Sequence, residues 1–209
     1  MPTHVTLFLA SSNPGKLAEY RALVETDAHG LNDALDSRVK IDLLPGFDFL
    51  PSFEEDAPTF AENAAGKALH YSRLAAGIVF ADDSGLVVPA LGGAPGVHSA
   101  RYAGPGATNA ERIAKLLGEL RGKIGSERTA YFVCAIAVAQ KGRATAIVTA
   151  RVDGEILEKP RGGGGFGYDP VFYFPALKKT FAELLPEEKN RISHRGKAFR
   201  KLLSALRTP

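Results

Sequence analysis

Residues 77–88, GIVFADDSGLVV, place two adjacent acids and a hydroxyl between two apolar runs. The pattern predicts a strand, a tight acidic turn and a second strand. Carboxylates at the end of a strand point into a cleft, where an unpaired charge is costly. Ionised Asp82 and Asp83 therefore need a cation, and a hard divalent metal ion is the usual one. The stretch predicts a metal-binding cleft beside a sheet.

The composition is that of an ordinary globular protein. The 209 residues are 45% hydrophobic, which suits one large domain or two closely merged lobes. No segment approaches the roughly 20 apolar residues of a membrane span, and the apolar stretch 5–10 is too short for a signal peptide. Cys134 is the only cysteine, which excludes an intramolecular disulfide and a cysteine-based metal site. We therefore expect a cytoplasmic protein.

The net charge of +3 is mildly basic. This charge fits a protein that binds a small anion through a few local cations, and it fits a solvated basic surface equally well. It is not the strong bias of a protein that coats nucleic acid.

Strand-like and helix-like segments alternate along the chain, which predicts an α/β fold without a separating linker. Gly142 favours a hairpin between the two longest strands. The predicted strands are residues 5–10, 39–44, 128–140 and 144–156, and the predicted helices are residues 16–25, 60–76, 108–120 and 186–207. The predicted connections are residues 26–38, 45–58 and 162–165.

Residues 11–16, SSNPGK, lie between the first predicted strand and the first predicted helix. Free backbone amides at a helix start attract anions, Gly15 lets the backbone approach a ligand closely, and Lys16 adds a point charge. The spacing is not that of a Walker A loop. A simple helix cap by Ser12 or Asn13 is the commoner use of such residues, so the stretch alone favours a cap over a phosphate site.

Residues 161–170, RGGGGFGYDP, contain a G-x-G-x-x-G pattern. No helix is predicted after it, which excludes a dinucleotide-binding turn. Glycines beside two aromatic residues favour a mobile loop that stacks a ring on a planar ligand, a contact worth about 1–3 kcal/mol per base. Asp169 could then accept a hydrogen bond from a base N–H. A bulged turn with its aromatic residues in the core is equally compatible with the pattern.

Residues 187–196 combine a helix start with clustered cations. Ser193 can cap the last helix, which puts His194 and Arg195 in its first turn. Because the helix dipole does not favour cations there, this placement indicates an anionic or carbonyl-rich ligand. A solvated charged face is the default alternative.

Taken in order along the chain, these elements resemble one known family. Residues 11–16 are similar to a T-x-N-x-x-K start, with a serine in place of the usual threonine. The motifs TFAENA, ADDSGL, LGGAPG, SARY, GFGYDP and SHRG follow at residues 59–64, 81–86, 91–96, 99–102, 165–170 and 193–196. The series resembles the inosine triphosphate pyrophosphatase family, in its bacterial branch of dITP/XTP pyrophosphatases. Residues 25–38 form a longer stretch than is typical of it.

The resemblance implies an enzyme that hydrolyses noncanonical purine nucleoside triphosphates, such as ITP, dITP and XTP, to the monophosphate and pyrophosphate, and so cleanses the nucleotide pool. It implies an α/β fold with a mixed, elongated central sheet and flanking helices, which form two lobes around an active-site cleft in one domain spanning residues 1–209. It also implies Mg²⁺ and a homodimer, with no nucleic-acid or membrane partner.

By position, the resemblance implies that Asp83 is the general base and a metal ligand. Glu54 matches the second metal carboxylate, with Glu55 beside it as the alternative, and Asp82 receives no role. The residues that match phosphate and sugar contacts are Ser11, Ser12, Asn13, Pro14, Gly15, Lys16, Ser84 and Lys189. The residues that match the base pocket are Phe166, Gly167, Tyr168, Asp169, His194 and Arg195.

The expected chemistry is in-line attack of water, with Lys16 and Lys189 holding the phosphates. Arg195 is expected to donate to the oxygen at position 6 of the base, where adenine carries an amino group instead. Guanine also carries this oxygen, so its rejection needs another cause. A nucleotide sensor without turnover would keep the glycine, aromatic and basic elements but would not need the acid pair. A nucleic-acid-binding module is disfavoured because the basic residues are scattered.

Overall fold

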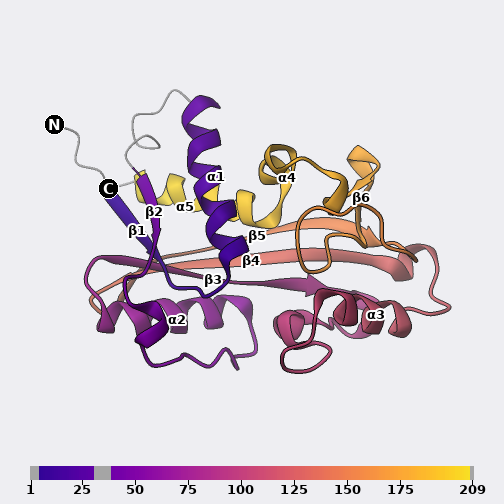
Figure 1. Ribbon diagram of the computed structural model, residues 1–209, viewed down its shortest axis with the longest axis horizontal. Coiled ribbons are helices and arrows are strands. Elements are labelled where there is room, and N and C mark those ends of the chain that lie inside the picture. Colours follow the sequence, from indigo (N-terminus) through magenta and orange to yellow (C-terminus); the bar gives the residue numbers. More distant parts are fainter. Residues whose placement is uncertain (1–4, 31–38, 208–209) are drawn as a thin grey trace.

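The computed structural model describes residues 5–30 and 39–207, and the strands of this part form one mixed sheet (Figure 1). The seven strands lie in the order β2-β1-β3-β4-β5-β6-β7. β1 pairs in parallel with β2 and with β3, and every pairing from β3 to β7 is antiparallel. The strands are β1 (Val5–Leu9), β2 (Val39–Leu43), β3 (Ile78–Val87), β4 (Thr129–Gln140), β5 (Arg143–Ile156), β6 (Phe172–Phe174) and β7 (Lys179–Thr180).

Helices cover both faces of the sheet. Figure 1 shows α2 (Phe60–Leu74) and α3 (Asn109–Glu119) on one face, and α1 (Pro14–Gly30), α4 (Pro186–Ile192) and α5 (His194–Arg207) on the other. The predicted α/β fold with a mixed sheet and flanking helices is therefore confirmed. Within the described ranges, no helix has both the length and the apolar character that a membrane crossing requires.

Local capping explains where three helices begin. Thr59 Oγ1 accepts a hydrogen bond from Glu62 N at 3.2 Å, and Thr108 closes a capping box at the start of α3. Ser193 Oγ accepts from Gly196 N at 3.1 Å, as predicted for the cap of the last helix. These side chains bond N–H groups that have no partner inside the helix. The helices predicted at residues 60–76 and 108–120 are confirmed, with small differences at their ends.

Strand β3 corrects the central prediction. The acidic residues do not form a turn, because β3 pairs with β4 without a break over Val79–Val87. Gly85 has another use. A Cβ at this position would lie 2.4 Å from Ser99 Oγ and 2.6 Å from Gly96 O, so glycine is needed for the close approach of a neighbouring segment. Asp82, Asp83 and Gly85 are residue types typical of turns, but here they lie in a continuous strand.

Helix α1 is longer than predicted. It begins at Pro14, whose fixed φ suits the first position of a helix, and it continues to Gly30. The predicted connection is therefore wrong for residues 26–30, and its remainder, residues 31–38, lies outside the described residues. The predicted hairpin is confirmed: β4 and β5 join at Lys141 and Gly142, which have φ values of 51° and 75°.

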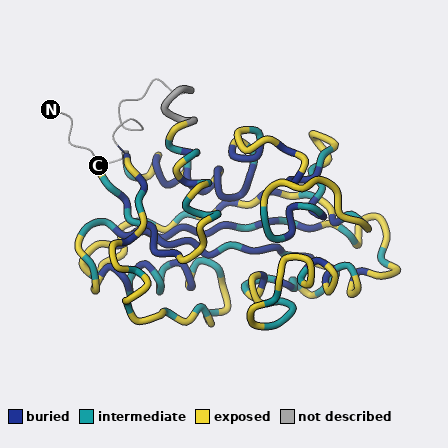
Figure 2. Tube along the Cα trace, in the orientation of Figure 1, coloured by how far each residue is buried: buried dark blue, intermediate teal, exposed yellow. Residues whose placement is uncertain are grey.

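Buried apolar side chains pack on both faces of the sheet, and Figure 2 shows that burial follows the strands. One cluster includes Phe199 of α5, a second includes Ala68 of α2, and a third includes Leu116 of α3. β3 contributes Phe80 to the first cluster and Leu86 to the third. The polar residues 82–84 of β3 therefore lie between apolar clusters.

Candidate active site

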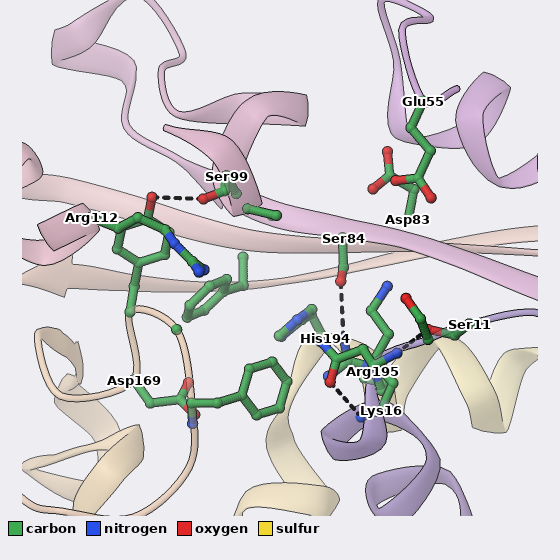
Figure 3. Close-up of a pocket in the computed structure, with 18 of the residues that line it drawn as sticks. Ser11, Lys16, Glu55, Asp83, Ser84, Ser99, Arg112, Asp169, His194 and Arg195 are labelled. Carbon is green, nitrogen blue, oxygen red and sulfur yellow. Dashed lines mark hydrogen bonds between the residues drawn. The ribbon is translucent and has the colours of Figure 1, made fainter. Parts of the chain in front are cut away.

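The candidate site lies at an open edge of β3. β1 pairs with β3 only as far as Phe80, where Ala10 N donates to Phe80 O at 2.9 Å. Beyond this point, no strand of the described chain pairs with residues 81–85 on this side. A pocket of about 310 Å³ fills the space, and Figure 3 shows side chains entering it from several elements. The carboxyl end of a parallel strand is a frequent position for a ligand site.

Asp82 and Asp83 point to opposite faces of the sheet, because side chains alternate along a strand. Asp82 is fully buried on the side of α1 and α5. Its Oδ1 lies 2.9 Å from Lys16 Nζ, and its Oδ2 lies 3.4 Å from Arg195 Nη2. Burial alone would raise the pKa of Asp82, but Lys16 and Arg195 bring it below the usual value. Asp82 is therefore an ionised anchor for two cations of the site.

Asp83 faces α2 and lines the pocket. Burial raises the pKa of its carboxyl to about 6, while a hydrogen bond from Asn63 lowers it and the nearby Glu55 raises it. Asn63 Nδ2 donates to Asp83 Oδ2 at 2.9 Å, and Asn63 Oδ1 accepts from Ala57 N at 2.9 Å. Asn63 thus fixes the orientation of the carboxylate. With a pKa near 6, Asp83 accepts a proton more readily than an ordinary aspartate does.

The acidic loop brings Glu55 to the pocket, and not the predicted Glu54. Side chains along residues 53–57 alternate between partly buried and exposed positions, and Glu54 is on the exposed side. Glu55 lines the pocket, where its carboxylate bonds Lys67 Nζ. Arg101 Nη2 donates to Glu55 O at 2.7 Å and so fixes the loop backbone. Figure 3 shows Glu55 beside Asp83.

The loop before α1 contributes Ser11, Ser12 and Asn13 to the pocket wall, and the first turn of α1 contributes Lys16. Asn13 Oδ1 accepts from Gly15 N at 2.9 Å, and Ser11 Oγ accepts from Asn13 N at 3.1 Å. Asn13 therefore caps the helix, as the alternative interpretation of the sequence held, and this capped turn also faces the pocket. Pro14 and Gly15 are not among the residues that line this pocket. A Cβ on Gly15 would lie 3.3 Å from the Phe166 ring.

Lys189 and Arg195 are joined by Glu19 of α1, a residue that the sequence did not single out. Glu19 Oε1 lies 2.8 Å from Lys189 Nζ, and Glu19 Oε2 bonds Arg195 Nη1. Lys189 Nζ also lies 2.7 Å from Asp169 Oδ2, and Arg195 Nη2 donates to Ser84 Oγ at 2.9 Å. With its bonds to Asp82, Arg195 uses four of its five N–H groups.

These charged side chains form a neutral cluster in the pocket wall. Its three cations are Lys16, Lys189 and Arg195, and its three carboxylates are Glu19, Asp82 and Asp169. Because every charge is close to an opposite one, the cluster presents hydrogen-bond donors to a ligand without a large net field.

The end of the pocket away from Glu55 and Asp83 is aromatic. The Phe132 and His194 rings stack with their centroids 4.7 Å apart and an interplanar angle of 13°. Burial lowers the pKa of His194 well below its usual value, so the ring is neutral near pH 7. Among the described residues, His194 Nδ1 has no hydrogen-bond partner. The Phe166 ring lies 4.9 Å from Lys189 Nζ.

Tyr168 and Asp169 hold the glycine-rich loop in place. The Tyr168 hydroxyl donates to Ser99 O at 3.0 Å and its ring is buried, so this ring is part of the core. Asp169 Oδ2 accepts from Phe166 N at 2.9 Å. Gly165 has a φ of +68°, and a Cβ there would lie 2.1 Å from Asp169 Oδ2. The predicted base-pocket residues are thus together, with Phe166 as the ring available for stacking.

The structure adds residues that the sequence did not predict: Glu19, Asn63, Lys67, Ser99, Arg112 and Phe132. Glu19 follows Lys16 by three positions in α1, and Lys67 follows Asn63 by four in α2. These spacings put each pair on one helix face, so they were signals that could have been used. Phe132 of β4 carries no comparable local signal.

Known proteins are similar to this chain over nearly its whole length. A family model described as the Ham1 family matches residues 7–205. The chain belongs to the Ham1 family. The relative named dITP/XTP pyrophosphatase in Geobacillus kaustophilus is 54% identical over 196 residues, which are 94% of this chain and 91% of that protein. The relative of the same name in Gloeobacter violaceus is 49% identical over 198 residues, 95% of this chain and 92% of that one.

Solved structures of similar proteins share the fold. A HAM1 protein from Coxiella burnetii has a TM-score of 0.81 at 43% identity, covering 97% of this chain and 98% of that one. A nucleoside-triphosphatase / dITP/XTP pyrophosphatase from Mycobacterium abscessus has a TM-score of 0.68 at 37% identity, covering 97% and 100%. The family resemblance drawn from the ordered motifs is therefore confirmed.

Proposed function

We propose that the chain hydrolyses noncanonical purine nucleoside triphosphates (ITP, dITP and XTP) to the monophosphate and pyrophosphate, as the names of its relatives indicate. The observation that carries the proposal is one pocket with two chemically different ends. Carboxylates, lysines and a capped helix start suit a triphosphate, and aromatic rings with a buried arginine suit a purine. Such an enzyme removes damaged precursors before they enter DNA or RNA.

Asp83 and Glu55 are the residues that would hold Mg²⁺. Their fit is supported by their position, because both carboxylates line the same pocket. Burial and the nearby Glu55 raise the pKa of Asp83, so a cation bound there would favour its ionised form. The described residues contain no cluster of three or more metal-binding side chains. Two carboxylates are nevertheless enough for Mg²⁺, which keeps waters and phosphate oxygens as its other ligands. The ion would polarise a phosphoryl oxygen and offset charge on the leaving pyrophosphate.

The chain's own residues then position and activate the reactants. Lys16 and Lys67 lie where they can bind the phosphate oxygens, together with the backbone amides near Asn13. Asp83 accepts the proton of the attacking water, and Asn63 keeps its carboxylate pointing into the pocket. The water attacks in line with the bond to pyrophosphate, so catalysis depends mainly on positioning.

The base would bind between the aromatic residues, with Phe166 as the stacking ring. Within the described part of the chain, one N–H group of Arg195, on Nη1, has no bonding partner, and it is the donor proposed for the oxygen at position 6 of the purine. A 6-amino group would face this donor without a bond, so adenine nucleotides bind poorly. In this proposal, residues 1–209 form one domain whose two lobes enclose the pocket as a cleft, and two copies associate as a homodimer.

Pyrophosphate release from ITP, measured with and without Mg²⁺, tests the activity. We expect Mg²⁺-dependent turnover of ITP, dITP and XTP and little turnover of dATP. Binding of ITP without turnover would instead indicate a nucleotide sensor. Light scattering after size-exclusion chromatography tests the dimer separately.

Asp83→Asn tests the assignment of the general base. The variant keeps the size of the side chain but not its basicity, so we expect kcat to fall about 100-fold or more at saturating Mg²⁺ and ITP. Thermal unfolding of the variant checks that the fold is retained. A folded variant that keeps most of the wild-type kcat would remove Asp83 from this role.

A further inference from the structure

Arg112 is a pocket residue that the proposed mechanism leaves without a role. It lies on α3, on the opposite face of the sheet from Arg195, and it lines the aromatic end of the pocket. Figure 3 shows its guanidinium pointing into the pocket near Ser99, far from Glu55 and Asp83. A nucleotide whose phosphates lie near Asp83 would reach this end with the six-membered ring of its base.

The charge of Arg112 is not neutralised in the way that the other pocket cations are. Its Nε and Nη2 donate to a single neutral acceptor, Ala107 O, at 3.1 and 2.6 Å. No ion pair joins Arg112 to a carboxylate in the described part of the chain, and the adjacent Glu111 is exposed and bonded to Thr108. Counting contacts among the described residues, Arg112 therefore brings a net positive charge and unused N–H donors to the base end of the pocket.

We propose that Arg112 reads position 2 of the purine and so determines the choice among 6-oxo purines. This inference rests on the proposed function. Xanthine carries an oxygen at position 2, which accepts a charge-assisted hydrogen bond from the guanidinium. Hypoxanthine carries only a hydrogen there and gains nothing. Guanine carries an amino group, and because a guanidinium has no acceptor, two donors would face each other without a bond.

In this assignment, two arginines recognise different positions of the purine. Arg195 of α5 faces position 6 and excludes adenine, and Arg112 of α3 faces position 2 and excludes guanine. The sequence offered no reason for the rejection of guanine, since Arg195 cannot distinguish guanine from hypoxanthine. A second cation on the far side of the same pocket supplies that reason.

The test is kcat/KM for XTP, ITP and GTP in the wild type and in Arg112→Gln. We expect the XTP-to-ITP ratio to fall about tenfold, the effect of losing one charge-assisted hydrogen bond. We expect the GTP-to-ITP ratio to rise, because the glutamine carbonyl can accept from the 2-amino group. Arg112→Lys should keep most of the XTP preference, since it retains the charge.

Arg121→Gln is the matched control. Arg121 is exposed just beyond α3 and outside the pocket, so its loss removes the same charge without a change in either ratio. An equal loss of activity on all three nucleotides in Arg112→Gln would show that Arg112 only supports the loop at Ala107, and unchanged ratios would show that it does not reach the base. Either result overturns the inference.

Binding of xanthosine and inosine monophosphates gives a readout that does not need turnover. Isothermal titration of the wild type and Arg112→Lys should show tighter binding of the xanthosine monophosphate in both, and the preference should be lost in Arg112→Gln. If the wild type hydrolyses none of the three triphosphates, the proposed function fails. If it hydrolyses XTP and ITP but the ratios do not depend on residue 112, only the inference about Arg112 fails.

Discussion

Glu54 and Glu55 carry the same side chain, but the two side chains point in different directions. In an extended loop, successive side chains point to opposite sides, so one of the two enters the pocket and the other enters solvent. The sequence located the acidic loop but could not decide between its glutamates. The path of the backbone determines which glutamate enters the pocket, and the hydrogen bond from Arg101 to Glu55 O fixes that path.

The two glutamates give a matched pair of variants. We expect Glu55→Gln to raise the Mg²⁺ concentration needed for half-maximal activity by about tenfold or more, because it removes one of two metal carboxylates. Glu54→Gln should leave this concentration unchanged, since its side chain is exposed. A Mg²⁺ titration of the initial rate measures both. If Glu54→Gln raised this concentration and Glu55→Gln did not, Glu54 would be the metal ligand.

His194 makes the stability of the protein depend on pH. Burial lowers the pKa of the folded-state ring well below its ordinary value. As the pH falls through about 6.5, the unfolded chain therefore takes up a proton that the folded chain does not. The stability that comes from the neutral ring is present above this pH and is lost progressively below it.

His194→Phe should remove this part of the pH dependence while keeping a ring stacked on Phe132. We expect the melting temperature of the wild type to decrease between pH 7 and pH 5 by more than that of the variant. Replacement of the exposed His98 by glutamine is the control and should follow the wild-type curve. Parallel curves for His194→Phe and the wild type would contradict the assignment.

At the scale of elements, strand β3 depends on a glycine in its interior. A Cβ on Gly85 would lie 2.4 Å from Ser99 Oγ and 2.9 Å from the Phe60 ring. We expect Gly85→Ala to lower the free energy of unfolding by about 2 kcal/mol, a typical cost of overpacking. Urea denaturation measures the change.

Gly118→Ala is the counterpart in helix α3. Nothing lies within 4 Å of an added Cβ there, and alanine is the better helix former. We expect this variant to be more stable than the wild type by about 0.5 kcal/mol. If both alanine variants changed stability in the same direction, close packing at Gly85 would not be the reason for its glycine.

The elements that the sequence predicted correctly are those whose causes are local. Thr59, Thr108 and Ser193 cap their helices by contacts within a few residues. Ser193 was predicted as a cap, and Thr59 and Thr108 lie at the starts of the helices predicted at residues 60–76 and 108–120. β3 was misread because its acids and glycine are explained by partners elsewhere: Asn63 for Asp83, Lys16 for Asp82 and Ser99 for Gly85. No window of sequence around residue 83 contains those partners.

At the scale of the whole molecule, Glu19 ties the first third of the chain to its end. Its carboxylate bonds Lys189 and Arg195, and the bond to Arg195 spans 176 positions of sequence. Removing the charge would leave two buried cations with fewer opposite charges nearby. We expect Glu19→Gln to lower the free energy of unfolding by about 2 kcal/mol, with a loss of kcat/KM as Arg195 moves.

Glu25→Gln is the control for this change, because Glu25 lies on the same helix with an exposed side chain. It should differ from the wild type by less than about 0.5 kcal/mol in the same urea titration. Equal effects of the two variants would mean that the link through Glu19 carries no stability.

The family and the order of its motifs could be predicted because each motif is contiguous in the sequence. The neutral cluster of three cations and three carboxylates could not, although most of its members were recognised individually. Lys189 and Arg195 were predicted as ligand contacts, and the structure shows that each is first a partner of Glu19. Charge balance is a property of the assembled pocket, and it appears only when distant segments meet.

The continuous path of β3 also restricts changes in chain length. A single residue inserted between Ile78 and Asp82, or deleted from that stretch, would shift the following side chains to the opposite face. The inserted form would direct one carboxylate away from Lys16 and Arg195, and the other away from Asn63. Any one substitution there spares at least one of these partnerships, whereas a length change breaks both. Evolution of this strand is therefore expected to proceed by substitution and not by insertion or deletion.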